Sequence, residues 1–201
     1  MPKTGDGVLC QLEGGLCRLT LNRPEKLNAL NAASFALLEK HLDAITAERV
    51  GCVLLTGAGR SFCAGHDLDD IAGGGEEGAV KRFETGIVER LATLPMPVVA
   101  AVQGHCFTGG LELALAADII IAAEDAKFAD THAKWDLVPI WGLSQRLPRR
   151  VGMAEIGLRI RECQAHRVLR RIEHERQCQH HQAVGVVVLL QKYVCQTMQH
   201  N

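Results

Sequence analysis

Hydrophobic and polar positions follow two different periods between residue 6 and about residue 150. Short apolar runs bounded by turn residues predict strands, and longer segments with an apolar residue every three or four positions predict amphipathic helices. The strands are predicted at Val8–Leu12, Leu16–Leu21, Cys52–Thr56, Val98–Val102 and Ile119–Ala122.

Three helices are predicted between these strands. The first covers Ala32–Glu48 with Asn31 as its N-cap, the second covers Ala79–Leu94 and stops before Pro95, and the third is the short apolar segment Gly109–Ala117. The apolar faces of the first two comprise Phe35, Leu38, Leu42 and Ile45, and Val80, Phe83, Ile87 and Leu91.

The order of these elements predicts an α/β fold. Gly14 and Gly15 separate the first two strands and are typical of a hairpin. The later strands are joined through helices, which implies right-handed crossovers and parallel pairing. The glycine-rich segment 73–78 is predicted to be a mobile loop between two helices.

Composition narrows the class of protein. The 201 residues are 47% hydrophobic and carry a formal net charge of −1, which argues against binding nucleic acid or a membrane surface through bulk positive charge. No apolar run approaches the ~20 residues of a membrane span, and the polar start predicts no secretory signal. We therefore expect a cytoplasmic protein whose eight cysteines, which form no C-x-x-C pair, are reduced thiols.

The composition and the hydrophobic periodicity of the sequence change near residue 153. Glutamine and histidine become frequent, and the apolar positions no longer form one clear helical stripe. The sequence therefore predicts a regular domain over residues 1–152 and an atypical segment over residues 153–201.

Two other kinds of site are not favoured by the residue spacing. Thr56–Gly59 follows a strand as a dinucleotide-binding loop does, but the third glycine of that motif falls on Phe62, and no phosphate-binding G-K-[ST] motif occurs. The histidines and cysteine near residue 178 fit no standard zinc spacing, so no metal site is expected. That group comprises His174, Cys178, His180 and His181.

Two glycine-containing turns are candidates for a ligand site. Ser61–Asp67 and Gly104–Glu112 each follow a predicted strand and lead toward a helix. Turns after neighbouring parallel strands emerge at the same sheet edge, where ligands bind. Two backbone N–H donors from separate turns can form an oxyanion hole.

Glu112 lies three residues after Gly109, so its side chain shares a face with the start of the third helix. A carboxylate at this place can move a proton beside a stabilised oxyanion. The alternative is structural, because a lone acid in an apolar helix also occurs where it pairs with an arginine or reaches solvent.

These residues occur within longer stretches that resemble the crotonase, or enoyl-CoA hydratase/isomerase, superfamily. The matching stretches are LTLNRPEKLNALN at 19–31, CVLLTGAGRSFCAGHDLDD at 52–70, PVVAAVQGHCFTGGLELALAADIIIAAEDAKFAD at 97–130 and THAKWDLVPIWGLSQRLPRRVG at 131–152. The resemblance implies a crotonase-like spiral of ββα units with a parallel sheet core, in which residues 1–152 bind acyl-CoA. The C-terminal helical part, over residues 153–201, is expected to be incomplete or atypical.

The resemblance also assigns roles to residues. The oxyanion hole falls on the N–H groups of His66 and Gly109, and Glu112 matches one of two catalytic glutamates. The substrate-binding residues it implies are Lys26, Leu27, Ala64, Gly65, Asp67, Leu68 and Gly110. No metal or redox cofactor is expected, since the coenzyme A thioester of the substrate itself acidifies the α-carbon.

His132 stands where the second hydratase glutamate is expected. Histidine can act as an acid or a base near neutral pH, and Asp130 is another possible partner, or His132 only lines the pocket. The resemblance favours hydration of a 2-enoyl-CoA in fatty acid metabolism, by a homo-oligomer that is a trimer or hexamer. The alternatives are a thioester hydrolase or isomerase of the same fold, or a non-catalytic protein that binds acyl-CoA or partner subunits.

Overall fold

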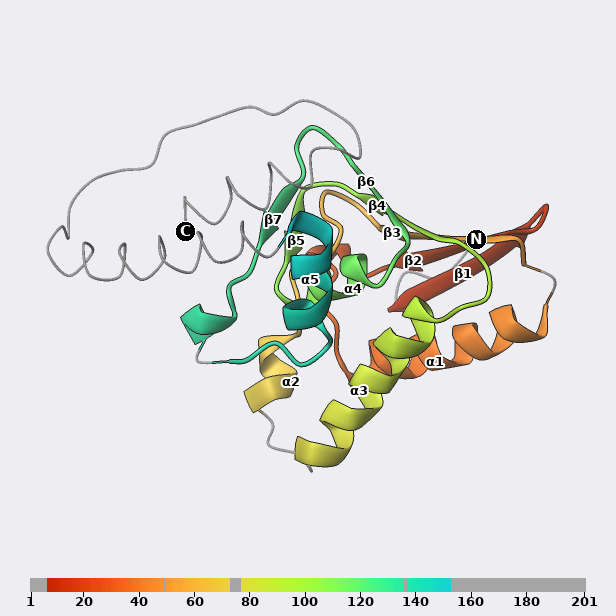
Figure 1. The fold of residues 1–201 in the computed structure, drawn as a ribbon. Helices are drawn as coiled ribbons and strands as arrows, with labels where there is room; N and C mark the ends of the chain where they lie inside the picture. The colour runs from red at the N-terminus through yellow and green to blue at the C-terminus, as the bar shows by residue number, and fades with distance from the viewer. Residues whose placement is uncertain (1–6, 49, 73–76, 136, 153–201) are drawn as a thin grey trace, which may run out of the picture.

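A five-stranded sheet forms the core of the computed structural model, which describes residues 7–48, 50–72, 77–135 and 137–152. The strand order is β1-β2-β3-β4-β6 (Figure 1). β1 and β2 form an antiparallel hairpin, and β2–β3, β3–β4 and β4–β6 pair in parallel, which confirms the predicted hairpin and parallel core. The strands are β1 (Val8–Glu13), β2 (Leu16–Leu21), β3 (Cys52–Gly57), β4 (Val98–Val102) and β6 (Ile119–Ala122).

A second, two-stranded sheet was not predicted from the sequence. It pairs β5 (His105–Phe107) in parallel with β7 (Lys127–Ala129). Each strand has only three residues, and β5 lies inside the segment that the sequence indicated as a turn. Strands this short leave too few alternating positions for a periodic signal.

Helices cover the sheets, and the turns of the candidate site lead into two of them, α2 and α4. In Figure 1, α1 and α3 run side by side below the large sheet, and α5 packs on α4. Asn31 caps α1 as predicted, since its side-chain oxygen accepts a hydrogen bond from Ser34 N at 2.9 Å. The helices are α1 (Ala32–Ala47), α2 (Leu68–Ala72), α3 (Glu77–Ala92), α4 (Gly109–Leu115) and α5 (Leu143–Val151), with short 3-10 turns η1 (Pro24–Lys26) and η2 (His132–Trp135).

The buried face of α3 differs from the predicted one. Val80 and Phe83 are 42% and 39% exposed, so the expectation that they face the core is wrong. The helix is rotated so that its inward positions follow an i, i+3, i+4, i+7 pattern that includes an acid. The buried residues on this face are Glu84, Ile87, Val88 and Leu91.

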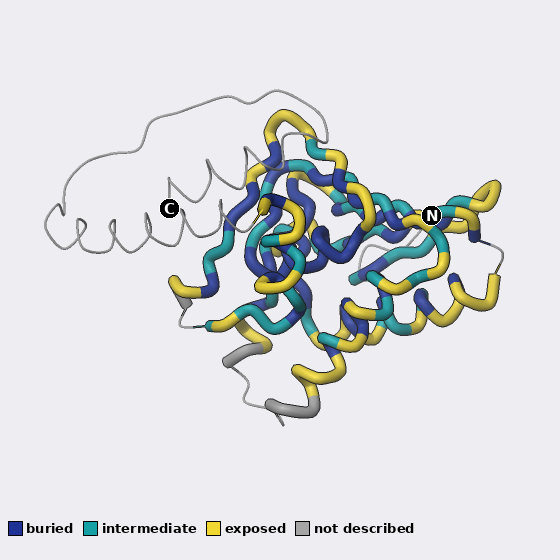
Figure 2. Tube along the Cα trace, viewed as in Figure 1, coloured by how far each residue is buried: buried dark blue, intermediate teal, exposed yellow. Residues whose placement is uncertain are grey.

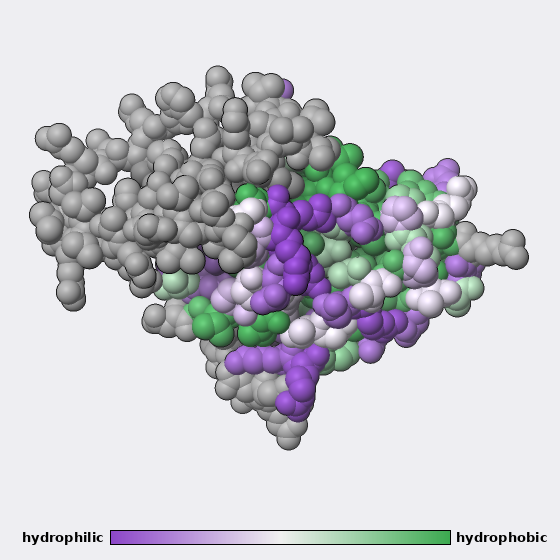
Figure 3. Space-filling view, viewed as in Figure 1, coloured by the Kyte–Doolittle hydropathy of each residue, from purple (hydrophilic) through white to green (hydrophobic). Residues whose placement is uncertain are grey.

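α5 has a polar sequence and was also not predicted. Only Leu143, Leu147 and Val151 are buried, and Pro148 lies inside the helix. The Arg150 side chain joins α5 to the turn between α4 and β6, because it donates to the carbonyls of Ala117 and Asp118. Figure 3 shows hydrophilic side chains over the α5 region and an apolar area where Figure 1 places β6.

Figure 2 shows the buried core between the large sheet and the helices. The five cysteines of the described residues are free thiols, as expected: Cys10, Cys17, Cys52, Cys63 and Cys106. No helix in the described ranges combines the length and apolar character needed to cross a membrane. The predictions for the segment 153–201, including its four candidate metal ligands, lie outside the described residues, as does most of the predicted loop at 73–78.

Candidate active site

The two glycine turns predicted from the sequence lie against each other. Cys63 N donates to His105 O at 2.9 Å, and Phe107 N donates to Cys63 O at 3.0 Å, so the first turn pairs with β5. Gly110 allows this approach, because a Cβ at its position would lie 2.3 Å from Cys63 O. Residues more than forty positions apart therefore form one site.

The two N–H groups that the family resemblance assigns to an oxyanion hole belong to neighbouring segments of the backbone. Gly65 has φ +114°, and a Cβ built on it would lie 3.5 Å from Gly109 N. In the described part of the chain, neither His66 N nor Gly109 N donates to a backbone carbonyl. Neither N–H is thus taken up by a backbone carbonyl, and the family resemblance assigns this pair to an oxyanion hole.

Thr108 is held in a strained conformation directly before Gly109. Its φ is 52° and its ψ is −115°, a region that β-branched residues rarely adopt. Thr108 N donates to Ala129 O at 2.8 Å, and its hydroxyl is 2.6 Å from that of Thr131. These contacts hold the peptide that presents Gly109 N–H, and such strain is concentrated at functional sites.

Glu112 is 1% exposed and lies on α4, in the first turn of the helix. Its Oε1 accepts hydrogen bonds from Trp141 N at 2.8 Å and Leu143 N at 3.0 Å. Within the described residues it neither pairs with an arginine nor reaches solvent, which were the structural alternatives. The two backbone donors hold the carboxylate in one orientation and leave Oε2 for another partner.

That partner is His132. Its Nε2 lies 3.5 Å from Glu112 Oε2, and its Nδ1 lies 2.6 Å from Asp130 Oδ1. Burial lowers the pKa of His132, but the hydrogen bonds and charges of Asp130 and Glu112 outweigh this effect and raise it to about 9. At neutral pH the site therefore holds an imidazolium between two carboxylates.

Because His132 is protonated, His132 and Glu112 can take different roles in proton transfer. A protonated His132 can donate a proton but cannot accept one, whereas the Glu112 carboxylate can accept one. Asp130 is itself affected, because burial raises its pKa but the hydrogen bonds to His132 lower the pKa below its usual value. The arrangement provides a base and an acid within 3.5 Å of each other.

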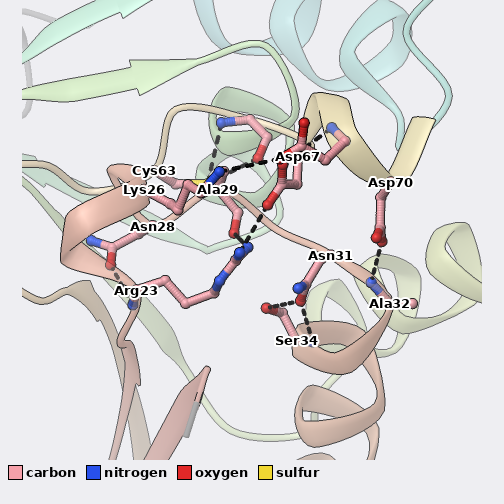
Figure 4. A network of polar contacts seen from close by, with 12 residues as sticks. Arg23, Lys26, Asn28, Ala29, Asn31, Ala32, Ser34, Cys63, Asp67 and Asp70 are labelled. Carbon is pink, nitrogen blue, oxygen red and sulfur yellow. Dashed lines mark hydrogen bonds and ion pairs between the residues drawn. The ribbon is translucent and has the colours of Figure 1, made fainter. Parts of the chain in front are cut away.

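The N-terminal loop reaches the first turn through a polar network (Figure 4). Although burial raises the pKa of Asp67, the Arg23 guanidinium 2.8 Å away holds it below its usual value. The Asp67 carboxylate is thus occupied by Arg23. The exposed Lys26 ammonium lies 3.1 Å from Asp69, and Leu27 O accepts from Ala64 N.

The other candidate substrate-binding positions lie on the N-terminal loop or close to it in the structure. Gly65 O accepts from Leu30 N at 2.8 Å, which ties the N-terminal loop to the first glycine turn. Leu68 begins α2 and is 44% exposed, so its apolar side chain is accessible on the surface. The structure therefore brings Leu27, Ala64 and Gly65 together, while Lys26 and Leu68 lie at the exposed margin.

Sequence reasoning missed two residues of the site. Trp141 is buried, its ring centroid lies 5.3 Å from that of His66, and a Cβ on Gly109 would touch its indole. Its position directly before the left-handed Gly142 was the available signal. Glu84 lies against His66 from α3, and it was missed because an acid at a core position of a helix breaks the apolar pattern.

Comparison with known proteins gives a consistent picture. Residues 11–165 match the model of a family described as enoyl-CoA hydratase/isomerase. A probable peroxisomal enoyl-CoA hydratase 1 of Arabidopsis thaliana is 45% identical over 140 residues, which are 69% of this chain and 52% of that protein. A 1,2-epoxyphenylacetyl-CoA isomerase of Escherichia coli strain K12 is 41% identical over 172 residues, covering 79% of this chain and 66% of that protein.

Solved structures agree with these matches. An enoyl-CoA hydratase from Mycobacterium tuberculosis H37Rv is 43% identical with a TM-score of 0.64, covering 74% of this chain and 62% of that one. An enoyl-CoA hydratase from Thermoplasma volcanium GSS1 has a TM-score of 0.71 at 30% identity, covering 77% and 63%. The likeness confirms the fold expected from the sequence. The chain spans between about half and two thirds of the length of the two curated relatives.

Proposed function

Because the chain belongs to the enoyl-CoA hydratase/isomerase family, we propose that it binds an acyl-CoA thioester and adds water to a 2-enoyl-CoA. The observation that carries the proposal is the buried Glu112 carboxylate, held beside an imidazolium and one helical turn from Gly109. Coenzyme A enters as part of the substrate, and the proposed step needs no further cofactor.

The two turns supply the electrostatic part of this reaction. His66 N–H and Gly109 N–H bind the thioester oxygen, and they bind it more strongly as it becomes an enolate oxygen. The strained Thr108 peptide and the close contact of Gly110 with Cys63 hold these donors in place before the substrate arrives. A donor that does not have to reorganise stabilises the enolate most effectively.

Glu112 and His132 supply the proton transfers. Glu112 removes a proton from water as the water oxygen bonds to the β-carbon, and the electron pair of the double bond moves to the thioester as an enolate. The His132 imidazolium then gives its proton to the α-carbon, which yields a 3-hydroxyacyl thioester. Glu112 is then protonated and His132 neutral, and a proton crossing their 3.5 Å contact restores both groups.

The remaining residues have binding roles in the proposal. Leu27, Ala64 and Gly65 line the thioester, Leu68 contacts the acyl or pantetheine chain, and Lys26 offers a cation for the coenzyme A phosphates. Asp67 acts through Arg23, whose guanidinium fixes the loop that carries these residues. By the resemblance to the family, the working form is a homo-oligomer, a trimer or hexamer, which sedimentation of the full chain tests.

The test compares crotonyl-CoA hydration by the full chain and by Glu112→Gln. The amide keeps the size of the side chain but cannot take a proton, so kcat should fall roughly 10²–10⁴-fold while acyl-CoA binding remains. Glu124→Gln is the matched control, because Glu124 is exposed in the loop after β6. Full activity of Glu112→Gln would overturn the assignment, and binding without turnover by the unmodified chain would favour the non-catalytic alternative.

A further inference from the structure

A buried glutamate on α3 lies against the residue whose N–H is assigned to the oxyanion hole. Glu84 is 1% exposed, and its Oε1 lies 3.3 Å from His66 Nε2. Within the described ranges, neither carboxylate oxygen of Glu84 has a hydrogen-bond partner of good geometry, and the same holds for His66 Nε2. The carboxylate and the imidazole therefore face each other as two buried polar groups.

The stability of the fold gives no reason for a glutamate at this position. Ile87, Val88 and Leu91, which share the inward face of α3, are all apolar. A buried carboxylate that lacks hydrogen bonds costs free energy, whereas a leucine in its place does not. Buried titratable groups of this kind are concentrated at functional sites, so the contact with His66 suggests a role in the site.

The His66 ring belongs to a stack of side chains that reaches the second N–H donor of the hole. Its centroid lies 5.3 Å from that of Trp141, and the Phe35 ring of α1 packs edge-on against both. A Cβ added to Gly109 would lie 2.3 Å from the indole of Trp141, so the backbone of this glycine touches the same ring. The contacts therefore run from Glu84 through His66 and Trp141 to Gly109.

We propose that Glu84 is a positioning residue for the oxyanion hole, and that it acts by holding the His66 ring against Trp141. The spacing between His66 N–H and Gly109 N–H depends on this stack, because both residues contact one indole. Supporting residues of this kind keep a site within the narrow range of productive geometry. The inference rests on the proposed function, in which the two N–H groups bind the thioester oxygen.

Loss of this support should affect the transition state more than the bound thioester. The negative charge on the thioester oxygen is greatest as the enolate forms, so a misplaced donor costs most at that stage. An interaction made mainly in the transition state changes kcat and leaves substrate affinity nearly constant. An apolar residue at position 84 also removes a buried carboxylate without hydrogen bonds, so the fold itself should not weaken.

The test replaces Glu84 by leucine in the full chain. Glu84→Leu should lower kcat for crotonyl-CoA hydration roughly tenfold, while KM and the Kd of butyryl-CoA change by less than about twofold. Butyryl-CoA labelled with ¹³C at its carbonyl carbon reports the hole directly, because weaker polarisation gives a smaller downfield shift of this resonance on binding. Stability in urea should stay equal or rise. Glu124→Leu, at an exposed position, is the control and should alter neither kcat nor the resonance.

A double-mutant cycle shows whether Glu84 acts through the imidazole. His66→Phe keeps the backbone N–H and an aromatic ring but removes the nitrogen that faces Glu84. In this background Glu84→Leu should have little further effect on kcat, because residues that act through one contact are not additive. Glu84→Gln, whose amide oxygen can accept a hydrogen bond from the imidazole, should lose less kcat than Glu84→Leu, and it carries the test if the leucine variant does not fold.

The outcomes separate this inference from the proposed function. Unchanged kcat and an unchanged carbonyl resonance in Glu84→Leu overturn the inference, while hydration by the unmodified chain upholds the proposed function. Additive effects in the cycle, or a loss of kcat that accompanies lower stability and weaker butyryl-CoA binding, indicate a purely structural role and also overturn it. If the unmodified chain binds butyryl-CoA but hydrates nothing, the hydratase assignment fails and the carbonyl resonance decides the inference. Absence of butyryl-CoA binding overturns both.

Discussion

The charge of His132 determines how the site can work. Glutamate at this place would give two carboxylates, whereas the structure has a cation between Glu112 and Asp130. The residue type was readable from the sequence, but its charge state was not, because that depends on two acids brought within hydrogen-bonding range by folding. The same holds for Glu84, whose contact with His66 appears only once α3 is seen to turn it inward.

The raised pKa of His132 predicts a pH-dependent stability. The pKa of His132 in the folded chain is about 9, above the ordinary value near 6.5. The stabilisation of the folded state by protonated His132 is therefore fully present below pH 6.5 and is lost as the pH rises through 9. The loss should be at most about 3 kcal/mol. Urea unfolding at pH 6, 8 and 10 measures it, and His132→Gln should lack this part of the decline; an equal decline in both proteins would contradict the prediction.

Asp130 should control the charge of its neighbour. Asp130→Asn removes the closest negative charge, so the pKa of His132 should fall by about 1–3 units. The basic limb of the kcat–pH profile should move down with it, since the proposed proton donor is the imidazolium. NMR titration of the His132 ring gives the pKa directly, and a pKa that stays near 9 in this variant would show that Glu112 alone sets it.

At the scale of elements, the site depends on how closely the glycine turns 61–67 and 104–112 approach each other. The strands β3 and β4 were predictable because apolar runs bounded by glycine or proline leave few alternatives. The contact between the first turn and β5 was not, since hydrogen bonds between Cys63 and β5 join residues far apart in sequence. α5 was missed for a similar reason, because its few apolar residues become meaningful only against α4.

Glycine substitutions test this approach. In Gly110→Ala the new methyl group would lie 2.3 Å from Cys63 O, a backbone atom that cannot move freely, so the unfolding free energy should fall by about 1–3 kcal/mol. Gly86→Ala is the matched control, because Gly86 lies in α3 with no atom within 4 Å of the added Cβ, and it should gain about 0.5–1 kcal/mol. Urea unfolding compares the two, and equal effects would show that the turns do not need their close contact.

For the whole molecule, the question is whether the chain binds an acyl-CoA as one folded unit. A saturated thioester such as butyryl-CoA cannot be hydrated, so it reports binding alone. At about 100 times its Kd a ligand stabilises the folded state by about 2.7 kcal/mol, which raises Tm by roughly 5–10 °C for a chain of this size. Calorimetry with Glu112→Gln should give the same shift, and no shift in the unmodified chain would contradict acyl-CoA binding.

The sequence alone determined the α/β class, the five strands of the large sheet and the two turns with Glu112, because these depend on local periodicity, turn residues and motif spacing. His132 became a candidate through the resemblance to the family. Only the tertiary structure decided the inward face of α3, the positions of Trp141 and Glu84, and the ion chain from Asp130 to Glu112. The physical reason is the separation in sequence of the residues that determine each property. Periodicity reports which residues are buried, whereas charge states and hydrogen bonds depend on which distant residues meet when they are buried.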